Sequence, residues 1–107
     1  MKLIFAIVNN DDSSIVTSKL TKNKFNVTKI ASTGGFLSAG NTTFLCGVED
    51  DRVNEVIEII AKYSRKRVES VPTGFSNELI PMTVGVQQIV VGGATIFVIN
   101  VERHERV

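Results

Sequence analysis

The most informative stretch of this chain is Thr33-Gly34-Gly35-Phe36-Leu37-Ser38-Ala39-Gly40-Asn41-Thr42-Thr43-Phe44. It lies between two expected β-strands and is longer than a reversal of direction requires, because Asn-Gly or Gly-Gly suffices for a hairpin. Glycine backbone can approach a ligand closely, the Phe36 ring can stack, and Asn and Thr side chains form neutral hydrogen bonds. The stretch therefore predicts a site for a planar, polar small molecule. A wide turn whose Phe36 and Leu37 pack against a neighbour stays open as the alternative.

Hydrophobic periodicity on both sides of this stretch predicts a series of strands and helices. A strand over Thr42–Val48 should turn Phe44, Cys46 and Val48 to one face, and the apolar run Lys2–Val8 should form a central strand. After the capping residues Glu49-Asp50-Asp51, a helix with Val53, Val56, Ile57 and Ile60 on one face should end near Arg65. The remaining expected segments are a turn and helix start at Asn9–Ser14, a helix over Ser13–Asn23, a strand over Phe25–Ser32, a glycine-rich loop over 33–42, a long loop over 67–82, strands over Thr83–Val91 and Ala94–Val101 joined as a hairpin at Gly92-Gly93, and a flexible polar tail over 102–107.

This order predicts a single α+β domain over residues 1–107, built as a ferredoxin-like βαββαβ sandwich with an extra C-terminal strand. Both helices should cover one face of the sheet and leave the other face bare. Apolar and β-branched residues on that bare face predict that another subunit covers it. The residues expected there are Thr28, Ile30, Leu45, Val84 and Val86.

Composition and charge exclude several classes of function. The chain has 107 residues, a formal net charge of +1 and 43% hydrophobic residues, so bulk charge predicts binding to neither nucleic acid nor membranes. Its one cysteine, Cys46, lies in a strand pattern, which predicts a buried structural thiol and a reducing, cytoplasmic setting.

Candidate catalytic groups are few. The one histidine, His104, lies in the tail, where a solvated side chain is expected. No zinc-binding pattern, P-loop or Gly-x-Ser-x-Gly motif is present, so no metal, cofactor or catalytic residue is predicted. The carboxylates at 49–51 are expected to cap a helix, and the cations at 62 and 65–67 are expected to close it, although a phosphate site at those cations stays open.

Four segments carry a resemblance to a known family. The glycine-rich stretch Thr33–Phe44 resembles that of the cyclic di-AMP receptors of the PII-like signalling family. The opening Met1–Val8 and the later Val91–Val98 resemble the same family in the same order, as does Gly47–Val53 at the entry to the second helix. Together the similar segments and their spacing cover about two-thirds of the chain.

The resemblance implies a non-enzymatic signalling protein, a homotrimer that binds cyclic di-AMP between subunits and relays it through loop rearrangement to an unknown downstream protein. By matching position it implies a ligand set of Thr28, Gly35, Phe36, Leu37, Asn41 and Gly47, with Phe97 nearby. Asn26 occupies the position at which the family typically carries an arginine, and it joins the set as a donor.

Alternative functions remain open. The chain differs from the family pattern at Asn26, in the long loop at Thr73–Leu79 and in its charged tail. These differences favour a trimeric interaction protein that has lost cyclic di-AMP binding. A relative that binds another adenine nucleotide also stays open. An acylphosphatase-like enzyme is disfavoured, because Asn9-Asn10-Asp11-Asp12 after the first strand is acidic and would repel phosphate.

Overall fold

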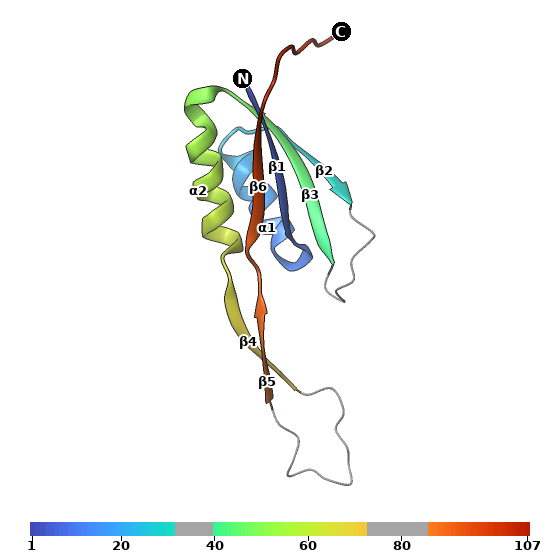
Figure 1. Ribbon diagram of the computed structural model, residues 1–107, viewed down its shortest axis with the longest axis vertical. Coiled ribbons are helices and arrows are strands. Elements are labelled where there is room, and N and C mark those ends of the chain that lie inside the picture. The colour runs from blue at the N-terminus through green and yellow to red at the C-terminus, as the bar shows by residue number, and fades with distance from the viewer. Residues whose placement is uncertain (32–39, 73–85) are drawn as a thin grey trace.

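The computed structural model describes residues 1–31, 40–72 and 86–107. Figure 1 shows a sheet with two helices and a separate pair of strands that extends away from them. The elements are β1 (Lys2–Asn9), α1 (Asn10–Lys22), β2 (Val27–Ala31), β3 (Asn41–Val48), a 3₁₀ turn (Asp50–Arg52), α2 (Val53–Ser64), β4 (Arg67–Pro72), β5 (Val86–Val91) and β6 (Ala94–Asn100). The greater part of the glycine-rich loop and of the long loop falls outside the described residues.

The main sheet consists of four antiparallel strands in the order β2-β3-β1-β6. As its apolar run predicts, β1 is central: Ile4 lies opposite Cys46 of β3 on one side and Val98 of β6 on the other. The mixed α+β class, with an antiparallel sheet and two helices, is confirmed and is consistent with the ferredoxin-like plan.

The hydrophobic core lies between this sheet and the two helices (Figure 1). Phe44, Cys46 and Val48 are buried there, which confirms the face predicted for β3. Of the face predicted for α2, Val56 and Ile60 are buried and Val53 packs partly buried against the core. The buried apolar residues are Ile4, Ala6, Val8, Val16, Leu20, Phe25, Phe44, Cys46, Val48, Val56 and Ile60. Burial raises the pKa of the Cys46 thiol, so this cysteine is a packing residue rather than a nucleophile.

No helix of the described chain covers the opposite face of the main sheet. This open face carries large apolar side chains that are about half exposed: Ile30 at 44%, Phe97 at 53% and Ile99 at 46%. Of the residues expected on it, Thr28, Ile30 and Leu45 are present, because they alternate with the core-facing positions of β2 and β3. Val84 lies outside the described residues. Val86 was wrongly assigned to this face, since it belongs to a second sheet.

The second sheet corrects two predictions. Residues 67–72 are not loop but strand β4, which pairs with β5 in antiparallel register, with Val68 opposite Val90. The expected hairpin at Gly92-Gly93 is also wrong, because β5 pairs with β4 while β6 pairs with β1. The extra strand is therefore part of a two-stranded arm, which Figure 1 shows extending beyond the helices, and the C-terminal strand is an edge of the main sheet.

The two glycines lead the chain from the arm into the main sheet. Both have left-handed backbone, with φ of +82° at Gly92 and +87° at Gly93. A Cβ at Gly92 would lie 2.6 Å from the Arg65 carbonyl oxygen, so only glycine fits there. The Gly93 amide donates a hydrogen bond to the Ser64 carbonyl at the end of α2. The backbone conformations of a Gly-Gly pair, which are typical of a hairpin turn, here connect β5 of the second sheet to β6 of the main sheet.

Helix α1 starts earlier than predicted, and helix α2 starts without the predicted side-chain caps. Helix α1 begins at Asn10, three residues before its predicted start, because the Asn9 side chain accepts a hydrogen bond from the Asp11 amide at 2.9 Å. At the second helix neither Glu49 nor Arg52 makes a side-chain cap. Asp50 instead pairs with the N-terminal ammonium at 2.8 Å, so these carboxylates do not cap the helix as expected.

One ion pair ties the arm to the first helix. The Arg67 guanidinium of β4 donates to both carboxylate oxygens of Asp12, at 2.9 and 3.1 Å. The Asp12 side chain is 8% exposed and that of Arg67 is 36% exposed. Hydrogen bonding to Asp12 raises the pKa of Arg67, so the guanidinium keeps its charge and its place in the pair. The cations expected only to close α2 thus include one that positions the arm.

We expect Arg67→Gln to lower the free energy of unfolding by about 1–3 kcal/mol, because Asp12 would keep a mostly buried carboxylate without its bidentate partner. Urea unfolding at one fixed protein concentration measures this difference. Arg65→Gln is the matched control, because Arg65 is an exposed cation two residues away. Equal losses in the two variants would mean that net charge, and not the Asp12 contact, sets the effect.

Candidate ligand-binding site

The open face of the main sheet is hollowed at one end, where β1 and β2 begin and β3 and β6 end. The antiparallel registers place these four strand ends together. The cavity there measures about 640 Å³, within the range of small-molecule sites. Its lining comes from three strands, the segment before β2 and the C-terminal tail: Met1, Leu3, Asn26, Thr28, Leu45, Gly47, Val101, His104 and Arg106.

Three of the predicted ligand residues meet in this cavity. Asn26 precedes β2, Thr28 lies on β2 opposite Leu45, and Gly47 lies on β3 opposite Leu3. They share the open face because the strand period of two turns alternate residues to the same side. The cavity thus combines an amide and a hydroxyl with an apolar floor, a suitable lining for a flat heterocycle with polar edges.

Gly47 leaves part of this space free. A Cβ built on it would lie 2.9 Å from the Met1 Cε, at the flexible end of a side chain. Apart from the adjacent residues of the chain, the described part of the structure places no other atom within 4 Å of it. Its backbone is ordinary strand, so glycine is not needed for conformation at this position. What glycine provides here is an uncovered stretch of backbone and floor.

The other predicted residues lie elsewhere. Asn41 begins β3, six residues before Gly47, which places it about 20 Å away at roughly 3.3 Å per residue. It lines a smaller hollow of about 270 Å³ together with Lys66, Gly92 and Gly93, among other residues. Phe97 lies on the open face opposite Phe5 and does not line the larger cavity. Gly35, Phe36 and Leu37 lie outside the described residues.

Two of the cavity residues that sequence reasoning missed lie in the tail, which was assigned a flexible role. His104 and Arg106 are exposed, yet both line the cavity. The tail is positioned by the register of β6, which ends opposite Lys2, and by a hydrogen bond from the Val101 amide to the Met1 carbonyl at 3.2 Å. Since only that long-range pairing sets the position, no local sequence signal could have revealed it.

The electrostatics of the cavity favour an anion. Among the described residues that line it there is no carboxylate, and Arg106 carries a permanent positive charge. The nearby Asp50 carboxyl is held by the N-terminal ammonium, whose hydrogen bond lowers the pKa of Asp50. The lining offers no paired acid and base for proton transfer, so the site as described can bind but has no catalytic pair.

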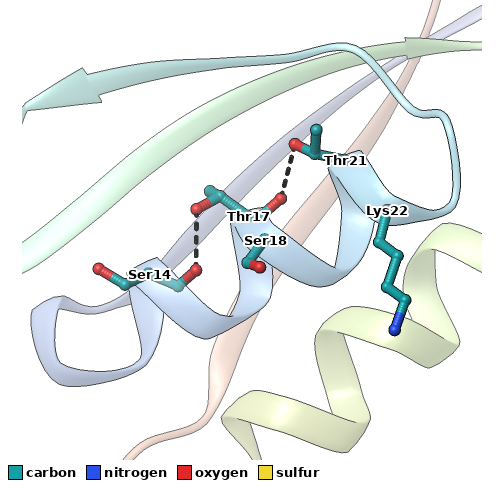
Figure 2. A pocket seen from close by; sticks show the side chains of 5 residues that line it. All are labelled: Ser14, Thr17, Ser18, Thr21 and Lys22. Atoms are coloured by element: carbon teal, nitrogen blue, oxygen red, sulfur yellow. Dashed lines mark hydrogen bonds between the residues drawn. The ribbon is translucent and has the colours of Figure 1, made fainter.

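A further hollow on the outer side of α1 has a different character. Figure 2 shows Ser14, Thr17, Ser18, Thr21 and Lys22 along one side of the helix. The Thr17 hydroxyl donates to the Ser13 carbonyl and the Thr21 hydroxyl to the Thr17 carbonyl, both at 2.8 Å. Because the two threonine hydroxyls already donate to the helix backbone, they have no free donor for a ligand, and the stripe is a polar helix surface.

Metal-binding clusters and membrane-spanning helices are both absent from the described ranges. These ranges contain no group of three or more His, Cys, Asp or Glu side chains arranged to hold a metal ion. None of the helices in those ranges is long and apolar enough to cross a membrane.

Comparison with known proteins adds two findings. The model of a protein family described as "Cyclic-di-AMP receptor" matches residues 1–107, the whole chain. The chain is also similar to the crystal structure of a functionally unknown protein from Pediococcus pentosaceus ATCC 25745, with 39% sequence identity and a TM-score of 0.78. That similarity covers 99% of this chain and 96% of the other. Likeness therefore extends over the full length, in sequence and in fold.

Proposed function

This chain belongs to the cyclic-di-AMP receptor family, and from that membership we propose that it binds cyclic di-AMP between the subunits of a homotrimer. It acts as a cytoplasmic, non-enzymatic PII-like signal transducer. Binding rearranges the glycine-rich and long loops, and a downstream protein recognises the rearranged loops.

The observation that supports this proposal most is the convergence of Asn26, Thr28 and Gly47 on one cavity. The edge of adenine presents a hydrogen-bond donor beside acceptors, and an Asn amide and a Thr hydroxyl can form hydrogen bonds with both kinds of group. Leu3 and Leu45 supply apolar surface for the ring, and the bare Gly47 backbone leaves room for it. Each base that also stacks on an aromatic ring would gain about 1–3 kcal/mol.

Two features support a site shared between subunits. The open face exposes Ile30, Phe97 and Ile99 beside the cavity, and a contiguous apolar surface of this kind is typical of an interface. In addition, Asn41 and Gly47 lie about 20 Å apart on one strand, so a single copy cannot bring both to one small ligand. A neighbouring copy can supply Asn41 to the cavity that holds Gly47.

Isothermal titration calorimetry with cyclic di-AMP, cyclic di-GMP, ATP and ADP tests the proposal. We expect heat of binding with cyclic di-AMP and at least about tenfold weaker binding of the others. Cyclic di-GMP lacks both adenines, and ATP and ADP lack the second adenine and the ring of two phosphodiesters that the shared site would contact. Light scattering on the same sample should give three times the mass of one chain.

A flat trace with cyclic di-AMP at high micromolar trimer would contradict ligand binding and favour the interaction protein without nucleotide. Binding of ATP or ADP in its place would favour the mononucleotide alternative. A monomeric mass would contradict the shared site.

A further inference from the structure

The C-terminal tail brings a positively charged side chain to a cavity whose lining side chains from the strands and from Asn26 are neutral. Strand β6 ends at Asn100, and Val101 is held by its amide bond to the Met1 carbonyl, 3.2 Å away. The tail therefore leaves the main sheet at the end that carries the cavity, where Met1 and Gly47 also lie. Beyond this anchor, His104 and Arg106 line the cavity.

The tail residues separate into two electrostatic groups. Arg103 pairs with Glu105, its guanidinium donating to the carboxylate at 2.6 Å, and neither residue lines the cavity. Arg106 and His104 are the tail residues with donor side chains in the lining. The Glu105 carboxylate next to Arg106 thus pairs with Arg103, and the ion pairs among the described residues include none of Arg106.

We propose that Arg106 is the phosphate-binding residue of the dinucleotide site, with His104 as a second donor. The inference rests on the proposed function and adds to it the group that recognises the ligand's charge. Cyclic di-AMP carries two phosphodiesters, each with one negative charge. A guanidinium presents planar donors that match phosphate oxygens, and Arg106 is the permanently charged side chain among the described lining residues.

This assignment divides recognition between two parts of the chain. The strands supply neutral contacts that read the adenine, through Asn26 and Thr28. The tail supplies the charge that selects a dinucleotide phosphate over an uncharged nucleoside. Binding should then depend on salt, since a cation and an anion that attract each other at an exposed site are screened by added ions.

The test is a comparison of Arg106→Gln with Arg103→Gln, measured by calorimetry with cyclic di-AMP at low and high sodium chloride. Both variants remove one charge from the same tail, three residues apart. We expect Arg106→Gln to weaken binding about tenfold to a hundredfold, the usual cost of a hydrogen bond to a charged group, and to reduce the salt dependence. Arg103→Gln should change affinity less than about threefold, as exposed ion pairs contribute little.

The Arg106→Lys variant separates the contribution of positive charge from that of the planar guanidinium. Lysine keeps the positive charge but loses the planar fork, so we expect it to retain clearly more affinity than glutamine does. If lysine and glutamine lose equal affinity, or if Arg103→Gln loses as much as Arg106→Gln, direct recognition of phosphate by Arg106 is wrong.

The outcome for the unmodified protein distinguishes the two proposals. If it binds cyclic di-AMP and Arg106→Gln binds equally well with the same salt dependence, the role of Arg106 is contradicted while the proposed function stands. If the unmodified protein itself does not bind cyclic di-AMP, both proposals are overturned.

Discussion

A Gly47→Val variant should lose cyclic di-AMP binding by more than about a hundredfold while it keeps its fold and its oligomeric state. Valine is favoured in strands, and Gly47 has ordinary strand backbone, so the substitution introduces no strain in the chain itself. Its Cβ would meet only the end of the Met1 side chain, at 2.9 Å. The added methyl groups and the displaced methionine would then occupy the floor on which we place the adenine.

Calorimetry measures the affinity in this experiment, and circular dichroism with light scattering verifies fold and mass. Thr43→Val is the matched control, because Thr43 lies on the same face of β3 but does not line the cavity. If Gly47→Val binds as tightly as the unmodified protein, the ligand does not contact this floor and the site lies elsewhere.

A Phe97→Asp variant should convert the proposed trimer into a monomer at micromolar concentration. Phe97 is 53% exposed on the open face and lies on the edge strand β6, opposite Phe5 of the central strand β1. A carboxylate placed there would have to lose its hydration for subunits to associate, a cost of several kcal/mol per subunit. In the separate chain the same carboxylate stays in water, so the fold of the monomer should be retained.

Sedimentation velocity across a range of concentrations measures the assembly. Phe97→Leu should remain oligomeric because it keeps an apolar side chain, and Ser18→Asp places the same charge on the exposed outer side of α1 as a control. An unchanged oligomer in Phe97→Asp would mean that the open face is not the interface. A monomeric Ser18→Asp would mean that added charge alone disrupts assembly.

The part of the fold that depends on local pattern was predicted well. The alternation of β3 assigned Phe44, Cys46 and Val48 to the core, and the 3.6-residue period of α2 assigned Val56 and Ile60 to it. Both patterns depend on residues a few positions apart in the sequence. They therefore do not change with the partner against which the strand or helix packs. The end of α2 was likewise predicted near Arg65, where the structure ends the helix at Ser64.

The errors share a different cause, which is partner choice. Gly92-Gly93 has the backbone freedom of a hairpin, but that freedom does not say whether β6 returns to β5 or passes on to β1. The segment Arg67–Pro72 has two valines and a terminal proline, too weak a pattern to indicate a strand before its partner β5 is known.

For the candidate site, the sequence identified candidate ligand-binding residues, and the fold decided which of them lie together. Resemblance in the motifs singled out Asn26, Thr28 and Gly47, and the antiparallel register of β2, β3 and β1 placed the three around one cavity. It also separated Asn41 from them by the length of the strand. The contribution of Arg106 could not be read from the tail, where a polar run of six residues carries no period.

What the sequence by itself determined is the set of local elements, the core face of each, and the family to which the motifs point. Only the tertiary structure decided that β6 pairs with β1, that the arm forms a second sheet, and that the tail reaches the cavity. The reason is physical: hydrophobic period and turn chemistry act between residues a few positions apart, whereas the pairing of Lys2 with Asn100 joins the two ends of the chain and depends on how all the strands between them compete for the same edge.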